Sequence, residues 1–162
     1  MKRAIYLLTI LILVPFGIAF AESQRFNKWK FESKTDAFTD EISFTIQSEV
    51  RRGFHLTLAC ADERPFLMMS SLFADTVLFS KVTQTDFRVD SKPAVSFEGI
   101  GVNSIIAFSS TNDSSSLVDY FRGGEKLMLR AEDFRGQRVT DTVSLSGFDE
   151  ALAHFANYCQ FQ

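Results

Sequence analysis

Apolar and polar residues alternate over several short stretches of the chain, a period of two that is typical of strands with one buried face. The alternation is clearest over 42–50, and it resumes over 54–60 after a break at 51–53, which predicts a hairpin. Further strands are predicted over 66–72, 83–89, 94–98, 105–109, 126–131 and 140–145. Short strands separated by polar or glycine turns indicate a mainly β fold, either an antiparallel β-sandwich or a partly open barrel.

Two segments have helical spacing instead. A short helix is predicted over 117–121, with Ser116 as its N-cap and Gly123 after its end. A C-terminal helix is predicted with Ser146 and Asp149 as its capping pair. Its apolar stripe is formed by Phe148, Ala151, Leu152, Phe155, Ala156 and Cys159. Such a stripe predicts that the helix packs on the sheet.

The first 21 residues have the layout of an export signal. Two basic residues precede an apolar run that ends in a small-x-small pattern at Ala21, where cleavage is predicted. An uncleaved membrane anchor is the alternative, because the apolar run is just long enough to span a bilayer. Pro15 and Gly17 argue against it, since they interrupt a helix. We therefore expect residues 22–162 to form a single exported domain without membrane insertion.

Charge and aromatic content limit the possible partners. The formal net charge is −3, which does not favour phosphate backbones or anionic lipids, so nucleic acid is not an expected partner. The 18 phenylalanines can bury a large apolar area, which predicts a folded domain.

Cys60 and Cys159 are the two cysteines of the chain. Cys60 falls on the inward face of its predicted strand and Cys159 on the apolar stripe of the last helix, so both point at the core. In an exported protein this predicts a disulfide that pins the helix to the sheet. Two buried free thiols are the alternative. A redox enzyme is disfavoured, because the chain lacks a C-x-x-C motif.

The sequence offers little chemistry for catalysis or cofactors. His55 lies on the polar face of a predicted strand, and His154 lies near the end of the last helix. Neither has a second ligand at metal-binding spacing, so no metal and no cofactor are predicted. Motifs of hydrolases, metalloproteases and phosphate-binding loops are absent from the sequence, which predicts a protein that is not an enzyme.

Two groups of residues are candidate contact sites. Asp86, Arg88 and Asp90 alternate along one strand face, where Arg88 either pairs with a carboxylate or neighbouring strand or contacts a ligand. Phe134 and Arg135 lie at the tip of a predicted hairpin over 132–138, with Gly136 as its turn residue. This pair serves either as a partner contact or as local packing.

The order of several landmarks resembles a known family. The landmarks are Trp29, Asp40, Leu56 to Cys60, Phe87 to Asp90 with Pro93 and Ala94, Ser144 to Phe148, and Cys159. In this order they are similar to the periplasmic accessory proteins of type VI secretion, the VasI/TagO family. Thr39 stands where that family has a further aspartate, and Phe97 where it has a tryptophan, so the resemblance is that of a diverged relative. It implies a β-rich periplasmic domain in a Gram-negative envelope, without established catalytic residues.

The resulting hypothesis is a periplasmic accessory or binding module that acts through protein contacts. An envelope or secretion-apparatus protein is the expected partner. The alternative is a periplasmic inhibitor of a cell-wall lytic enzyme, for which the loop-like stretch 109–116 or the Phe134 tip would enter the enzyme's cleft. A hydrolase would require residues that converge only in the fold.

Overall fold

The computed structural model describes residues 22–49, 52–61, 64–72, 79, 82–108 and 111–159, so the predicted signal segment lies outside the described residues. The strands are β1 (Ser23–Phe26), β2 (Trp29–Thr35), β3 (Ile42–Ser48), β4 (Phe54–Ala61), β5 (Arg64–Ser71), β6 (Val82–Val89), β7 (Val95–Val102), β8 (Ile105–Phe108), β9 (Lys126–Glu132) and β10 (Arg138–Ser144). The helices are α1 (Thr111–Phe121) and α2 (Phe148–Phe155). No helix within these residues is long and apolar enough to cross a membrane.

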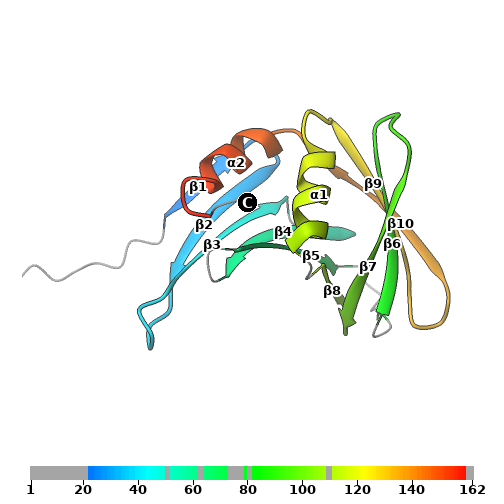
Figure 1. Cartoon of the computed structure of the whole chain (residues 1–162), viewed down its shortest axis with the longest axis horizontal. Coiled ribbons are helices and arrows are strands. Elements are labelled where there is room, and N and C mark those ends of the chain that lie inside the picture. Colours follow the sequence, from blue (N-terminus) through cyan, green and yellow to red (C-terminus); the bar gives the residue numbers. More distant parts are fainter. Residues whose placement is uncertain are drawn as a thin grey trace, which may run out of the picture.

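The strands form one antiparallel sheet in the order β1-β2-β3-β4-β5-β8-β7-β6-β9-β10. The sheet curls around both helices, which lie on its inner side (Figure 1). The mainly β prediction is confirmed, and a single curled open sheet corresponds to the partly open alternative rather than to two stacked sheets. The curl brings β10 toward β4, where the Phe54 N–H donates to the Asp141 carboxylate at 2.7 Å.

Aromatic side chains fill the space between the sheet and the helices. Phe121 of α1 lies 5.8 Å from Phe87 of β6 and 5.9 Å from Phe148 of α2, measured between ring centroids. Trp29 of β2 contacts Phe148 from the other side, at 4.8 Å. All four side chains are buried. The high phenylalanine content therefore serves a core in which rings from distant segments meet at tilted or edge-to-face angles.

The first two strands were not predicted from the sequence. In β2, Trp29 and Phe31 point inward, while the charged residues Lys30 and Glu32 alternate with them. β1 is almost wholly exposed and pairs only with β2. An edge strand of this kind has no apolar face of its own, so periodicity cannot reveal it.

The prediction for the first helix was wrong at its start. α1 begins at Thr111, inside the stretch predicted as a loop, so Ser116 lies within the helix and is not its N-cap. Ser114 is fully buried in the first turns; its hydroxyl donates to the Phe108 carbonyl at 2.7 Å and accepts the Leu67 N–H at 3.3 Å. A serine satisfied by tertiary partners is compatible with a helix, although its local preference is for loops.

The predicted cap of the last helix was also wrong. Gly147, with φ 88°, occupies the N-cap position, and no side chain caps the helix. The Asp149 carboxylate instead accepts the Gly123 N–H at 3.0 Å, and the Ser146 carbonyl accepts the Lys28 N–H at 3.1 Å. The predicted capping pair thus connects α2 to other segments. Its buried face is the predicted stripe from Phe148 to Phe155.

Candidate interaction surface

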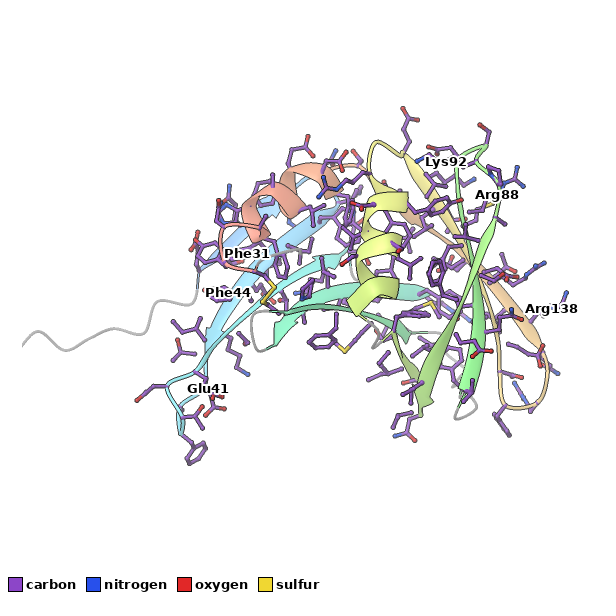
Figure 2. All side chains as sticks on the ribbon, viewed as in Figure 1. Phe31, Glu41, Phe44, Arg88, Lys92 and Arg138 are labelled. Atoms are coloured by element: carbon purple, nitrogen blue, oxygen red, sulfur yellow. A yellow bond between two sulfur atoms is a disulfide. The ribbon has the colours of Figure 1, made fainter. Side chains whose placement is uncertain are left out.

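Cys60 of β4 and Cys159, just beyond α2, form a disulfide, as predicted. Their Cα atoms are 5.9 Å apart, and 99 positions separate them in the chain. Phe44, the register partner of Cys60, stacks on Tyr158 at 4.6 Å, and Figure 2 shows Phe44 beside the bridge. The bond fastens the C-terminal segment to the sheet, and a structural disulfide indicates an oxidising compartment outside the cytoplasm.

The two histidines lie in separate places. His154 packs against Phe31 at 4.5 Å, and its Nε2 is 3.5 Å from the Glu22 carboxylate. His55 is half-buried on β4, where burial lowers the pKa of its imidazole and a hydrogen bond to the Ser48 backbone opposes that shift. Among the described residues, no group of histidine, cysteine or acidic side chains has the arrangement of a metal site.

Asp86 is held by partners other than Arg88. Its carboxylate accepts the Ser96 hydroxyl at 2.6 Å and the Arg130 Nε–H at 2.8 Å. Ser96 on β7 and Arg130 on β9 are the register partners of Asp86 on either side. The Ser96 hydroxyl, followed by the Arg130 guanidinium, lowers the pKa of Asp86 against the opposing effect of burial. The Asp86 carboxylate thus stays ionised, and its bonds to Ser96 and Arg130 connect three strands.

The structure separates the remaining two members of the predicted group. Asp90 has a φ of 48° in the turn after β6, and its carboxylate accepts the backbone N–H groups of Lys126 and Glu125 at 2.9 and 3.1 Å. These bonds stabilise the turn. The Arg88 side chain is exposed, and its guanidinium makes no hydrogen bond or ion pair with any residue that the structure describes. Figure 2 shows Arg88 and Arg138 on the outer side of the sheet, away from α1.

Two shallow hollows lie beside the Asp86–Arg130 pair on this outer face. One, of about 240 Å³, is lined by Arg88, Ala94, Met128 and Thr140 together with the pair. The other, of about 210 Å³, is lined on its polar side by Gln84, Glu132 and Arg138. Both are smaller than typical small-molecule pockets of roughly 300–1,000 Å³. They offer room for a side chain or chain terminus of a larger partner.

Phe134 and Arg135 lie in the turn of the β9–β10 hairpin. The Arg135 guanidinium donates to the buried Asp133 carboxylate from Nε at 3.0 Å and from Nη2 at 2.8 Å. Burial opposes ionisation of Asp133, but the backbone N–H groups of Gln137 and Arg135 and this guanidinium keep its pKa below the usual range. Gly136 has the predicted turn conformation, with φ 77°. Arg135 therefore supports the turn, whereas Phe134 is 54% exposed.

The β2–β3 hairpin carries a second exposed aromatic, which the sequence did not single out. Phe38 is 98% exposed at its tip. The Asp36 carboxylate accepts the backbone N–H groups of Phe38 and Thr39 at 2.8 and 3.0 Å, and these bonds lower the pKa of Asp36. The tip is thus an ordered turn that projects its ring into solvent.

An apolar strip that the sequence did not predict lies on the outer face of β5, β8, β7 and β6. Its members occupy adjacent register positions: Met68, Ala107, Ile100 and Val82 form one row, and Ile105 and Val102 a second. Val82 and Val102 are each 61% exposed. Because α1 and α2 both lie on the inner side, neither of these two helices covers the strip (Figure 1). Scattered apolar side chains are normal on a surface, but a contiguous group indicates a contact site.

The strip has a sequence signal in β7. Gly99 and Gly101 are buried on the inner side, so Ile100 and Val102 point outward. A Cβ at position 99 would overlap Ile106, so the close approach of β8 requires glycine there. An alternation of glycine and aliphatic residues can thus mark a strand whose aliphatic side faces solvent, the reverse of the usual assumption.

Residues 79–156 match the family model of the invasion associated locus B (IalB) proteins. This match covers just under half of the chain and runs from before β6 to the end of α2. The fold is also similar to the crystal structure of invasion associated protein b from Bartonella henselae, with a TM-score of 0.58 and 15% sequence identity. The similarity covers 85% of this chain and 97% of that one. No curated protein matches the chain significantly.

The resemblance to type VI secretion accessory proteins was therefore wrong. The IalB match overturns it, and the structure explains why the landmarks misled. Trp29 is a core residue, Asp90 stabilises a turn, and Cys60 and Cys159 form a disulfide. These landmarks serve the packing and the turns of the fold, needs that unrelated families can meet with the same residue types.

Proposed function

We propose that this chain is an IalB-type protein, exported to the periplasm of a Gram-negative bacterium, that works by binding another protein. The IalB match and the fold similarity support the family assignment. The disulfide and the signal-like N-terminus support export. By extension from the Bartonella protein, we propose an association with invasion, exerted through contact rather than catalysis.

The observation that carries this proposal is the apolar strip. Its central side chains are uncharged, and they lie on neighbouring strands of a rigid sheet, which suits a preformed contact surface. Interfaces of this type place apolar residues at the centre and polar residues at the rim. Glu98 and Gln84, next to the strip on β7 and β6, are exposed polar residues in such a rim. The expected partner is an envelope protein with a complementary apolar surface.

Site-specific photo-crosslinking in cells tests this function. A photoreactive residue at position 100 or 102 should give one discrete adduct, whereas the same residue at Gln24, on the exposed edge strand β1, should give none. Once identified and purified, the adduct protein should bind Ile100→Lys at least about tenfold more weakly than wild type. Gln24→Lys, which adds the same charge elsewhere, should bind normally. No adduct, an adduct with a second copy of this chain, or unchanged binding of Ile100→Lys would each contradict the proposal.

Inhibition of a cell-wall lytic enzyme is a second candidate. The stretch 109–116 no longer supports it, since α1 occupies most of that range. The Phe134 tip does, because its exposed ring projects from a hairpin supported by the Asp133–Arg135 pair. Purified protein should then inhibit a lysozyme, and Phe134→Ala should abolish inhibition while leaving the fold intact. Full activity of the enzyme at high concentrations of the protein would exclude this function.

A further inference from the structure

The hollow beside Arg88 has a charge opposite to that of the whole protein. Its ionisable side chains are Arg88, Arg130 and Asp86, which leave one net positive charge, whereas the chain carries −3. Asp86 is already bound to Arg130 and to the Ser96 hydroxyl. The guanidinium of Arg88 makes no such bond with the described residues, so its donors are available to an anion.

The floor of the same hollow is apolar. Met128 on β9 is the register partner of Arg88. Ala94, just before β7, lies on the other side of Arg88. Thr140 on β10 closes the far side as the register partner of Arg130. A ligand that fits here therefore combines a negative group at one end with a small apolar group at the other. The volume of about 240 Å³ limits it to a fragment the size of a terminal residue.

We propose that this hollow binds a carboxylate attached to an apolar residue, with Arg88 pairing with the carboxylate and Met128 contacting the apolar group. Arginine suits this role, since its planar fork matches the two oxygens of a carboxylate. The carboxylate can belong to the C-terminus of a chain or to an acidic side chain. The site is separate from the apolar strip, so it goes beyond the proposed function, and either can fail without the other.

NMR titration of the purified, isotope-labelled protein with small probes tests the site. N-acetyl-leucine carries the carboxylate and the apolar group; N-acetyl-leucinamide lacks the charge; N-acetylglutamate α-amide carries a side-chain carboxylate. We expect N-acetyl-leucine to shift the backbone amide signals of Arg88, Met128 and their strand neighbours, and to bind about five- to tenfold more tightly than the leucinamide. Comparison with the glutamate probe identifies which source of carboxylate the hollow prefers.

Arg88→Gln removes the charge of the side chain but leaves a polar group in its place. It should weaken binding of N-acetyl-leucine by the same five- to tenfold factor, which is about the loss expected for one charge-assisted pair. Arg88→Lys should restore part of the affinity. The matched control is Arg25→Gln, which removes an exposed arginine from β1 at the opposite edge of the sheet and should change nothing. Equal binding of the amide and the acid, unchanged binding by Arg88→Gln, signal shifts elsewhere, or no shifts at all would overturn the proposal.

Discussion

The indole N–H of Trp29 donates to the backbone carbonyl of Ser144 at 3.0 Å, which joins the start of β2 to the end of β10. These strands lie near opposite ends of the strand order. The Lys28 N–H, which donates to the Ser146 carbonyl, adds a second bond at the same place. These two bonds thus connect segments more than 100 positions apart across the curl of the sheet.

Trp29→Phe keeps a ring against Phe148 but removes the indole donor. We expect the free energy of unfolding to fall by about 1 kcal/mol, the usual net value of one hydrogen bond. Trp29→Ala should cost about 3–5 kcal/mol, because it also opens a cavity in the core. Urea unfolding followed by circular dichroism measures both. Equal stability of Trp29→Phe and wild type would show that the Trp29–Ser144 bond does not hold the curl.

Removal of the Cys60–Cys159 bridge should release the C-terminal segment. For a loop of about 100 residues, loss of chain entropy sets a ceiling of about 4.7 kcal/mol, and measured losses are typically about 2–4 kcal/mol. The double variant Cys60→Ala, Cys159→Ala should be less stable by that amount. Limited proteolysis should cut it first within or after α2.

Two checks accompany the disulfide prediction. Mass spectrometry of non-reduced wild-type protein should find the two cysteine peptides linked. A reducing agent should lower the stability of wild type but not that of the double variant. Free thiols in freshly purified protein, or equal stability of both forms, would contradict the prediction.

The parts of the fold that follow from local pattern could be predicted. Strands β3 and β4 combine a large apolar side chain at every second position with polar neighbours, and periodicity located both. The disulfide followed from the same logic, because both cysteines continue an apolar face. β1 could not be found this way because it is an exposed edge strand without an apolar face. The start of α1 could not be found either, since the bonds of Ser114 to the Phe108 carbonyl and the Leu67 N–H outweigh its local preference for loops.

The candidate surface was predicted only in part. Arg88 was identified, but the pairing of Asp86 with Arg130 was not, because these two residues are 44 positions apart and meet only through strand register. Phe134 was identified as a tip residue, and its exposure agrees with that position. The apolar strip was missed because alternation alone does not reveal which side of β7 faces the core; that depends on the close approach of β8 to Gly99.

Stability should fall in acid through Asp133. The pKa of this carboxyl is lower in the folded protein than its ordinary value of 3.8. A carboxyl group whose pKa is lower in the folded state than in the unfolded state stabilises the protein fully at pH values above its unfolded-state pKa. This contribution is lost as the pH falls through the pKa of the folded state. The melting temperature of wild type should therefore decline progressively below about pH 5.

Asp133→Asn separates this effect from general acid unfolding. The variant should melt below wild type at pH 7, because the Arg135 guanidinium loses its ionised partner, and its melting temperature should depend less on pH in the acid range. Glu98→Gln, which neutralises an exposed carboxylate on β7, serves as the control and should retain the wild-type profile. Parallel pH profiles of Asp133→Asn and wild type would contradict the assignment.

Gly147 should be intolerant of a side chain for two separable reasons. Its φ of 88° lies in the left-handed region, which costs an ordinary residue about 1–2 kcal/mol. In addition, a Cβ at this position would overlap the Phe26 carbonyl oxygen, which is backbone and cannot move away freely.

Gly123 provides a matched control, since its φ is 68° but nothing lies within 4 Å of the position of a Cβ. Gly123→Ala should therefore show the conformational cost alone, whereas Gly147→Ala should lose clearly more stability in urea unfolding, by a total of more than about 2 kcal/mol. Equal losses in the two variants would mean that the contact between the start of α2 and β1 yields easily, and that the helix is held by its buried face alone.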